Sequence, residues 1–218
     1  MIPFTKAELE AIRQAVKSAE GQTSGEIVPF VSVRSSDYTL ALWRAAGIMS
    51  LLGLGAFLAA GQWSSAWGAA WLQAPWALAL VVLLSGGVGW LAAYSIPAVK
   101  RLIIGQEGMA EAVHARAIKA FVQEEVFDTR DRTGILLFVS QFERRIEVMG
   151  DAGINAAVSS DDWVDVIKVV KQGITDGKLA DALVAGIGRC GDLLERKGVE
   201  IKPDDTNELP DGLRFDSD

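Results

Sequence analysis

The chain has 218 residues, of which 50% are hydrophobic and 22% charged, and its formal net charge is −7. This acidic balance provides no basic face to neutralise phosphates, which argues against nucleic-acid binding. The single cysteine, Cys190, rules out an intramolecular disulfide, and one cysteine with one histidine cannot build a zinc site.

The first predicted element is an amphipathic helix over residues 6–20. Thr5 and Glu8 have the spacing of a capping box, in which each side chain accepts a hydrogen bond from the backbone N–H of the other residue. Apolar residues follow at helical spacing: Leu9, Ile12 and Val16. These first twenty residues have no apolar core and therefore do not resemble a secretory signal.

Residues 25–33 are predicted to form a strand. Their apolar side chains do not alternate with polar ones, which indicates a strand covered on both faces. Pro29 has no N–H to donate to a neighbouring strand, so it favours an edge position or a local irregularity.

The window 45–99 contains no Asp, Glu, Lys, Arg or His. Because a membrane pass takes about 20 apolar residues, this window accommodates two passes, which we place near residues 42–61 and 76–99. The alternative is a helical hairpin buried in a soluble core, which the length of the two uncharged runs disfavours. Residues 62–75, between the passes, are predicted to form a short helix at the membrane interface, because three tryptophans recur there every four residues: Trp63, Trp67 and Trp71.

Positive charges flank the two passes but do not occur between them, as the flanking residues show: Arg34, Arg44, Lys100 and Arg101. The positive-inside rule then places both termini in the cytoplasm. We therefore expect a two-pass protein of a bacterial inner membrane, with its soluble domain on the cytoplasmic face. The second pass carries small residues that would let another helix approach closely, either the first pass or a partner protein: Ser85, Gly89 and Ala93.

After the second pass, residues 108–125 are predicted to form an amphipathic helix. His114 lies next to its apolar face and has no nucleophile pattern nearby, so it is interpreted as a surface or boundary residue rather than a base or a metal ligand. The run 135–140 is continuously apolar, as in a strand buried on both faces, and residues 145–151 alternate. The short connection between these two runs predicts an antiparallel hairpin.

Two more helices are predicted, one that begins at Ser159 or Ser160 and one over residues 178–197. Residues 199–218 are acidic and poor in apolar side chains, and we predict a disordered tail there.

Together these elements predict an α/β fold: a small mixed sheet between helices, in an α/β/α sandwich that is interrupted by a two-helix transmembrane hairpin. The opening helix and strand are too short to fold alone. We therefore expect residues 1–39 and 100–198 to form one domain, with the hairpin inserted at 40–99.

Parallel pairing of the strand at 25–33 with the strand at 135–140 would bring Glu26 close to Asp151 and to the turn that contains Asp131. Carboxylate oxygens suit Ca²⁺ or Mg²⁺, so Glu26, Asp131 and Asp151 are candidate metal ligands. Arg132 and Arg144 are candidate phosphate-binding residues. The alternative is that these side chains only cap strands and turns.

No standard enzyme signature is present. The chain has no Gly-x-Ser-x-Gly elbow, no phosphate-binding Gly-x-x-x-x-Gly-Lys loop and no His-Glu-x-x-His pair. The acidic stretch near the C-terminus does not fit an EF-hand loop, because Leu209 stands where an Asp or Asn is needed. The sequence thus names no catalytic residue.

Several segments nevertheless resemble the TPM domain family. The resemblance rests on Thr23-Ser24-Gly25-Glu26-Ile27-Val28, on residues 129–140, 143–148 and 151–154, on Trp163, and on the tail motif Asn207-Glu208-Leu209-Pro210-Asp211. It implies an α/β/α sandwich. Members of that family include a thylakoid-lumen protein of photosystem repair and bacterial membrane proteins; phosphatase activity or calcium binding is attributed to some members, and an accessory or scaffold role to others. The inserted hairpin departs from the soluble members.

We therefore expect a membrane-anchored TPM-type domain that acts as a binding or accessory protein in envelope maintenance or protein quality control. Its expected partners are the lipid bilayer and a membrane or envelope protein. The alternative is a phosphatase that depends on Ca²⁺ or Mg²⁺ and uses the carboxylate-rich edge of the sheet.

Overall fold

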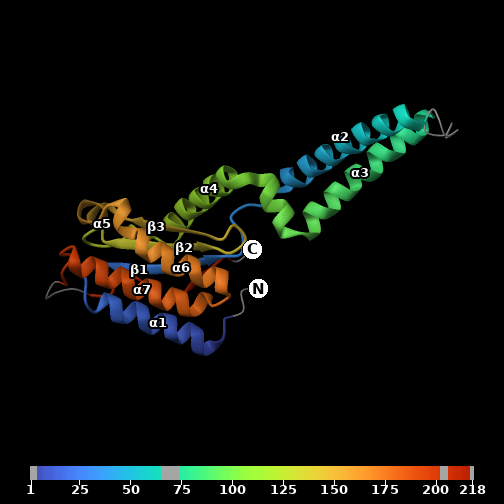
Figure 1. Ribbon diagram of the computed structural model, residues 1–218. Helices are drawn as coiled ribbons and strands as arrows, with labels where there is room; N and C mark the ends of the chain where they lie inside the picture. The colour runs from blue at the N-terminus through green and yellow to red at the C-terminus, as the bar shows by residue number, and fades with distance from the viewer. Residues whose placement is uncertain (1–3, 65–73, 202–205, 217–218) are drawn as a thin grey trace. The chain divides into compact units, whose positions relative to one another are not determined.

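The computed structural model describes residues 4–64, 74–201 and 206–216 (Figure 1). The chain divides into two compact units. The first combines Met1–Ser36 with Ala110–Asp218, and the second consists of Asp37–Met109.

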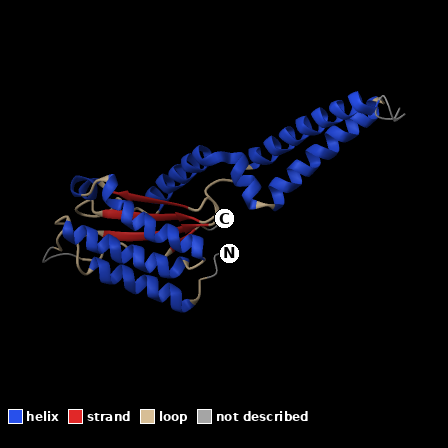
Figure 2. Ribbon diagram, viewed as in Figure 1, coloured by secondary structure: helices blue, strands red, loops and turns tan. Residues whose placement is uncertain are grey.

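The first unit is built on a sheet, drawn in red in Figure 2. The sheet has four strands in the order β3-β2-β1-β4. Its strands are β1 (Glu26–Ser32), β2 (Gly134–Ser140), β3 (Arg145–Gly150) and β4 (Arg214–Phe215). β1 and β2 are parallel, with Glu26 opposite Gly134, and β2 and β3 form the antiparallel hairpin that the sequence predicts. β4 flanks β1 only at Phe30 and Val31, so Pro29 lies outside the part of β1 that has strands on both sides.

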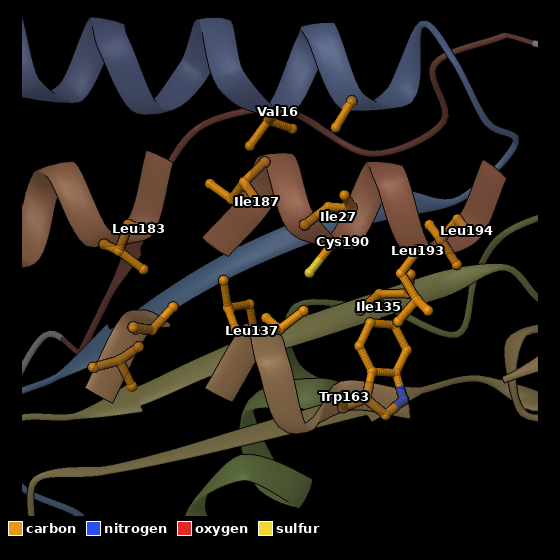
Figure 3. Close-up of a cluster of buried hydrophobic side chains, with 14 of the residues drawn as sticks. Val16, Ile27, Ile135, Leu137, Trp163, Leu183, Ile187, Cys190, Leu193 and Leu194 are labelled. Carbon is orange, nitrogen blue, oxygen red and sulfur yellow. The ribbon is translucent and has the colours of Figure 1, made fainter. Parts of the chain in front are cut away.

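Helices cover both faces of this sheet, which confirms the predicted α/β/α sandwich. On one face lie α1 (Lys6–Glu20), α6 (Val164–Asp176) and α7 (Leu179–Arg196), whose apolar stripes pack on inward-facing strand residues such as Ile27, Ile135 and Leu137 (Figure 3). On the other face, Val113 and Ala117 of α4 (Pro97–Gln123) pack against strand residues that include Phe30 and Phe138. Because both faces are covered, every residue of β1 and β2 is buried and the two strands are continuously apolar in their interiors.

Helix boundaries agree with the sequence at α1, where Thr5 and Glu8 form the capping box. They differ at α4, which begins at Pro97 rather than near residue 108. Gly105 interrupts α4 with φ 77° and ψ 168°, a conformation that only glycine adopts without strain. The single turns α5 (Ala152–Ala157) and η2 (Ser160–Trp163) precede α6, and the sequence pattern does not predict α5.

The predicted disordered tail is wrong for residues 206–216. Arg214 and Phe215 form β4, and Leu209 is buried in the cluster that contains Phe30 and Phe138. Two ion pairs hold the segment as well: Arg214 with Glu124 at 3.0 Å and Asp216 with Arg116 at 2.6 Å. Its acidic composition suggested disorder, but a few buried apolar side chains and two ion pairs are enough to hold the segment against the rest of the domain. The other residues of the predicted tail that lie at 202–205 and 217–218 fall outside the described part.

The second unit contains two long helices, α2 (Thr39–Ser64) and α3 (Pro75–Ser95), packed on each other. Their contact is made of small residues. A Cβ added at Gly89 would lie 2.5 Å from the carbonyl oxygen of Ala45, and one added at Gly86 would lie 2.5 Å from the Ser50 hydroxyl. The small-residue stripe of α3 therefore packs on α2.

The outward surfaces of α2 and α3 are apolar and exposed, as their large side chains show: Leu51, Leu52, Leu58, Leu83, Leu84 and Leu91. Thr39–Gln62 and Pro75–Ser95 are both long and apolar enough to cross a membrane. The predicted interfacial helix between them falls mostly on residues 65–73, which lie outside the described residues.

Candidate functional site

The predicted carboxylate-rich edge is the end of the sheet at which β1 and β2 start. Glu26 opens β1 and Gly134 opens β2 beside it, while the N–H of Asp151 donates to the Gly134 carbonyl at 2.9 Å. The fold thus brings Glu26 and Asp151 to the same edge of the sheet, as the sequence predicts. Both carboxylates are buried, at 6% relative exposure each.

Asp151 is held by neighbouring protein groups. Arg132 donates from Nε at 2.5 Å and from Nη2 at 2.9 Å, and the N–H of Ala152 donates at 2.7 Å, so Asp151 also caps α5. Burial raises the pKa of the Asp151 carboxyl, but these hydrogen bonds and the Arg132 charge outweigh it, and the net shift is downward. Asp151 is therefore an ionised carboxylate in a two-pronged pair with arginine.

The other predicted ligands have different neighbours. The backbone N–H groups of Glu208 and Leu209 donate weakly to Glu26, at 3.3 and 3.4 Å. Asp131 lies 3.5 Å from the Nε of Arg130. Within residues 4–64, 74–201 and 206–216, no group of three or more His, Cys, Asp or Glu side chains is arranged to hold a metal ion. The ligand set Glu26, Asp131 and Asp151 stays a prediction.

The two candidate phosphate-binding arginines do not meet. Arg132 precedes β2, whereas Arg144 lies in the turn between β2 and β3, at the opposite end of the sheet. A seven-residue strand separates them, which spans about 20 Å. Arg132, whose side chain is 56% exposed, is the one that shares the edge with Asp151.

A small pocket that the sequence did not reveal adjoins Glu26. It measures about 200 Å³, and its lining includes Lys17, Glu20 and Glu26. Oε1 of Glu20 accepts the N–H of Ile27 at 2.9 Å, but Oε2 is buried with no hydrogen-bond partner in the described part of the chain. Burial raises the pKa of Glu20 to about 8; the Ile27 N–H opposes this shift, and the nearby charges of Glu26 and Asp211 reinforce it. No local pattern marks Glu20, because only the fold brings the end of α1 against the start of β1.

A larger open cavity, of about 690 Å³, runs along β3 on the outer side of the sheet. One wall is apolar and consists of Ile146, Val148, Trp163 and Ile167. Polar side chains also line the cavity: His114, Glu147, Asn155, Ser159 and Ser160. The rest of the lining is Met149, Gly150 and Val158. We call this cavity the β3 groove. The alternation of β3 was visible in the sequence, but its place at the outer side of the sheet was not.

In the β3 groove, the side chains of His114, Asn155 and Ser159 bond to nearby side chains or backbone rather than forming a nucleophile–base arrangement. His114 Nδ1 lies 2.8 Å from Glu147 Oε1, and the exposed position of His114 agrees with its interpretation as a surface residue. The Ser159 hydroxyl donates to Asp162 at 2.7 Å as part of the cap of η2. Cys190 is also unsuited to catalysis, because complete burial raises the pKa of its thiol to about 12 (Figure 3).

Comparisons with known proteins agree with this fold. The chain is similar over its whole length to the BA42 protein of the psychrophilic bacterium Bizionia argentinensis, whose NMR structure superimposes with a TM-score of 0.59 at 21% identity. The match covers 99% of this chain and 98% of that one, and at this identity it shows the fold alone. The curated proteins give no match. Residues 98–193 match the family model described as the TPM domain. The family match over residues 98–193 and the fold shared with BA42 together support the assignment of this chain to the TPM domain family.

Proposed function

We propose that the chain is a membrane-anchored binding protein, in which the α2–α3 hairpin inserts into the bacterial inner membrane and the TPM domain binds a membrane or envelope protein at the cytoplasmic face. The role is accessory, in envelope maintenance or protein quality control. The observation that carries the binding role is the β3 groove, an open cavity beside a strand that has a neighbour on one side only.

The anchoring half of the proposal is supported by the exposed apolar side chains of α2 and α3. Soluble monomers rarely expose apolar patches of more than a few hundred Å², and lipid is the solvent that such helices fit. Two serine hydroxyls of the hairpin are satisfied within it: Ser50 donates to the Val82 carbonyl at 3.0 Å and Ser85 to the Val81 carbonyl at 2.7 Å. This arrangement suits a region in which no water is available.

Site-specific photo-crosslinking in intact cells tests the binding role. A photoreactive residue replaces Asn155 in the β3 groove of the full-length chain, and a matched variant carries it at Glu195, an exposed position on α7. We expect a discrete adduct that only the groove variant forms and that mass spectrometry identifies as a membrane or envelope protein. Adducts that are absent, or equal at both positions, would contradict a partner site in the groove.

A second candidate function, a phosphatase that depends on Ca²⁺ or Mg²⁺, is favoured by the unpartnered Oε2 of Glu20 beside Glu26. These two carboxylates would hold the cation, which would supply a Lewis acid for a phosphoryl oxygen. Arg132 uses Nε and Nη2 for Asp151 and its side chain is 56% exposed, so the remaining N–H groups of its guanidinium could bind a phosphate beside this pair.

Metal dependence separates the two functions. Calorimetry of the full chain with Ca²⁺ and Mg²⁺ is followed by a phosphatase assay of Glu20→Gln and Glu26→Gln, which alter the two carboxylates that would hold the cation. Metal-dependent turnover that both substitutions abolish would replace the pure binding role by an enzymatic one. If neither binding nor turnover is found, the phosphatase candidate is eliminated and the binding role is unaffected.

A further inference from the structure

β3 has a strand neighbour on one side only in the described sheet, β2. In an antiparallel pair, alternate residues direct both backbone groups toward the partner strand and the residues between them direct theirs away. The bond from the Asp151 N–H to the Gly134 carbonyl sets this alternation. Arg145, Glu147 and Met149 therefore bond to β2, while Ile146 and Val148 direct their N–H and C=O groups outward.

The β3 groove lies along this outward side and receives residues from both faces of the sheet. The consecutive residues 146–150 all line it. Ile146 and Val148 adjoin the cluster that contains Trp163, on the α6 face, and Met149 adjoins the cluster on the α4 face, where Glu147 meets His114. The open space thus follows the path that a fifth strand would take.

We propose that the β3 groove binds an extended segment of a partner protein as a fifth strand of the sheet, by backbone hydrogen bonds to Ile146 and Val148. This inference rests on the proposed binding role and names how the partner is recognised. Strand addition of this kind takes its affinity from main-chain bonds and its specificity from alternate side chains.

The lining of the groove defines the chemistry of the segment. Side chains on the α6 face meet the apolar wall formed by Ile146, Val148, Trp163 and Ile167. Side chains on the α4 face meet the Glu147 carboxylate, of which Oε1 lies 2.8 Å from His114 Nδ1. The charge of this carboxylate favours Lys or Arg in the segment. The partner segment is therefore an extended stretch in which apolar residues alternate with basic ones.

The test uses the full-length chain in detergent micelles and a labelled seven-residue peptide that alternates lysine and valine. Two further versions of the peptide carry N-methyl groups, on the valine nitrogens in one and on the inner lysine nitrogens in the other. In a strand, only one of these sets faces β3: the valine set if pairing is antiparallel and the lysine set if it is parallel. We expect fluorescence anisotropy to show binding of the parent peptide, loss of binding with one methylated set, and retention with the other. No binding of the parent peptide, or equal tolerance of both sets, would overturn strand addition.

Substitutions in β3 test the same contact by changing the protein instead of the peptide. Val148→Pro removes an outward N–H without removing a bond to β2, and we expect it to abolish peptide binding. Glu147→Lys reverses the charge on the α4 face and is expected to weaken binding about fivefold or more; Glu195→Lys is its charge-matched control on exposed α7. If Val148→Pro alters the circular dichroism spectrum, the methylated peptides still decide the question.

Two outcomes separate this inference from the proposed function. If the in-cell adduct persists in Val148→Pro with full yield, the binding role stands and strand addition fails. If the chain instead dimerises with rising concentration and Val148→Pro prevents this, a second copy occupies β3 and the partner segment proposed here is wrong.

Discussion

Glu20 and Asp151 are both acidic residues at the same side of the sheet, yet their surroundings shift their pKa values in opposite directions. Asp151 has the guanidinium of Arg132 against it, whereas Glu20 has one backbone N–H and a second carboxylate, Glu26, nearby. The position of Asp151 at the same end of the sheet as Glu26 could be predicted from the sequence, because strand pairing sets it. The Glu20 contact could not, because it depends on how α1 packs.

The raised pKa of Glu20 predicts a loss of stability with rising pH. Its pKa is about 8 in the folded protein and 4.5 in the reference state, so its contribution is fully present below about pH 4.5 and is lost as the pH rises through 8. One such group changes the free energy of unfolding by at most about 1.4 kcal/mol per pH unit. Glu20→Gln should remove this dependence and be more stable than the parent at pH 8, as measured by urea unfolding in detergent at several pH values.

The control is Glu10→Gln on the same helix. Hydrogen bonds from Arg13 and Gln14 hold the pKa of exposed Glu10 at about 2, so its titration lies in acid. A parallel response of both variants between pH 5 and 9 would refute the assignment to Glu20.

Among the elements, the buried strands were the most predictable and the C-terminal segment the least. A strand covered on both faces is continuously apolar, as in residues 135–140, so it can be recognised from its own sequence without knowledge of the rest of the fold. The C-terminal segment has only Leu209, Leu213 and Phe215 as large apolar residues between acidic ones, and their partners on β1 and α4 exist only in the finished fold. The β3 groove could not be predicted for the same reason, because the order of strands in a sheet cannot be determined from the sequence of any one segment.

Docking of the C-terminal segment predicts that Leu209→Ala destabilises the TPM domain. Leu209 is 8% exposed and packs with Phe30 and Phe138, so its truncation should cost about 2–3 kcal/mol in the free energy of unfolding. Ile201→Ala, at a position that is 50% exposed, should change this energy by less than about 0.5 kcal/mol. Equal effects of the two substitutions in denaturant titrations would show that the segment does not stabilise the fold.

The α2–α3 contact provides a matched pair of glycines. Gly89→Val would place its Cβ within 2.5 Å of the Ala45 carbonyl oxygen, a backbone atom that cannot move aside, whereas Gly87 has nothing within 4 Å. We expect Gly89→Val to lower the midpoint of thermal unfolding in detergent, followed by circular dichroism, and Gly87→Val to leave it unchanged. If Gly87→Val were as harmful, helix propensity rather than packing would be responsible.

For the whole molecule, the hairpin separates two parts of the chain that share one sheet. β1 comes before α2 and α3, and β2 to β4 come after them. The length of the uncharged window predicted two passes. The parallel pairing of β1 with β2 joins the segments before and after the hairpin in one domain. The packing of the stripe at Gly89 could not be predicted, because a partner protein would have fitted the same small residues.

The proposed membrane orientation rests on the charges that flank the hairpin. Arg34, Arg44, Lys100 and Arg101 should keep both ends of the hairpin in the cytoplasm. A fluorescent protein fused to either terminus is expected to be fluorescent, and alkaline phosphatase inserted within 65–73 is expected to be active. Replacement of all four basic residues by glutamine should give mixed orientations; fusions that report opposite sides for the two termini would refute a two-pass topology.

The interruption between β1 and β2 also affects the order of events during synthesis. When β1 leaves the ribosome, its parallel neighbour is about a hundred residues away, which takes roughly 5–20 s to translate. In that interval a strand whose residues are all destined for burial has no sheet to join. Under the proposed anchoring, this domain can complete its sheet only after α2 and α3 have been inserted, and a cell in which the insertion machinery is slowed should accumulate chains that proteases cut between α1 and α2.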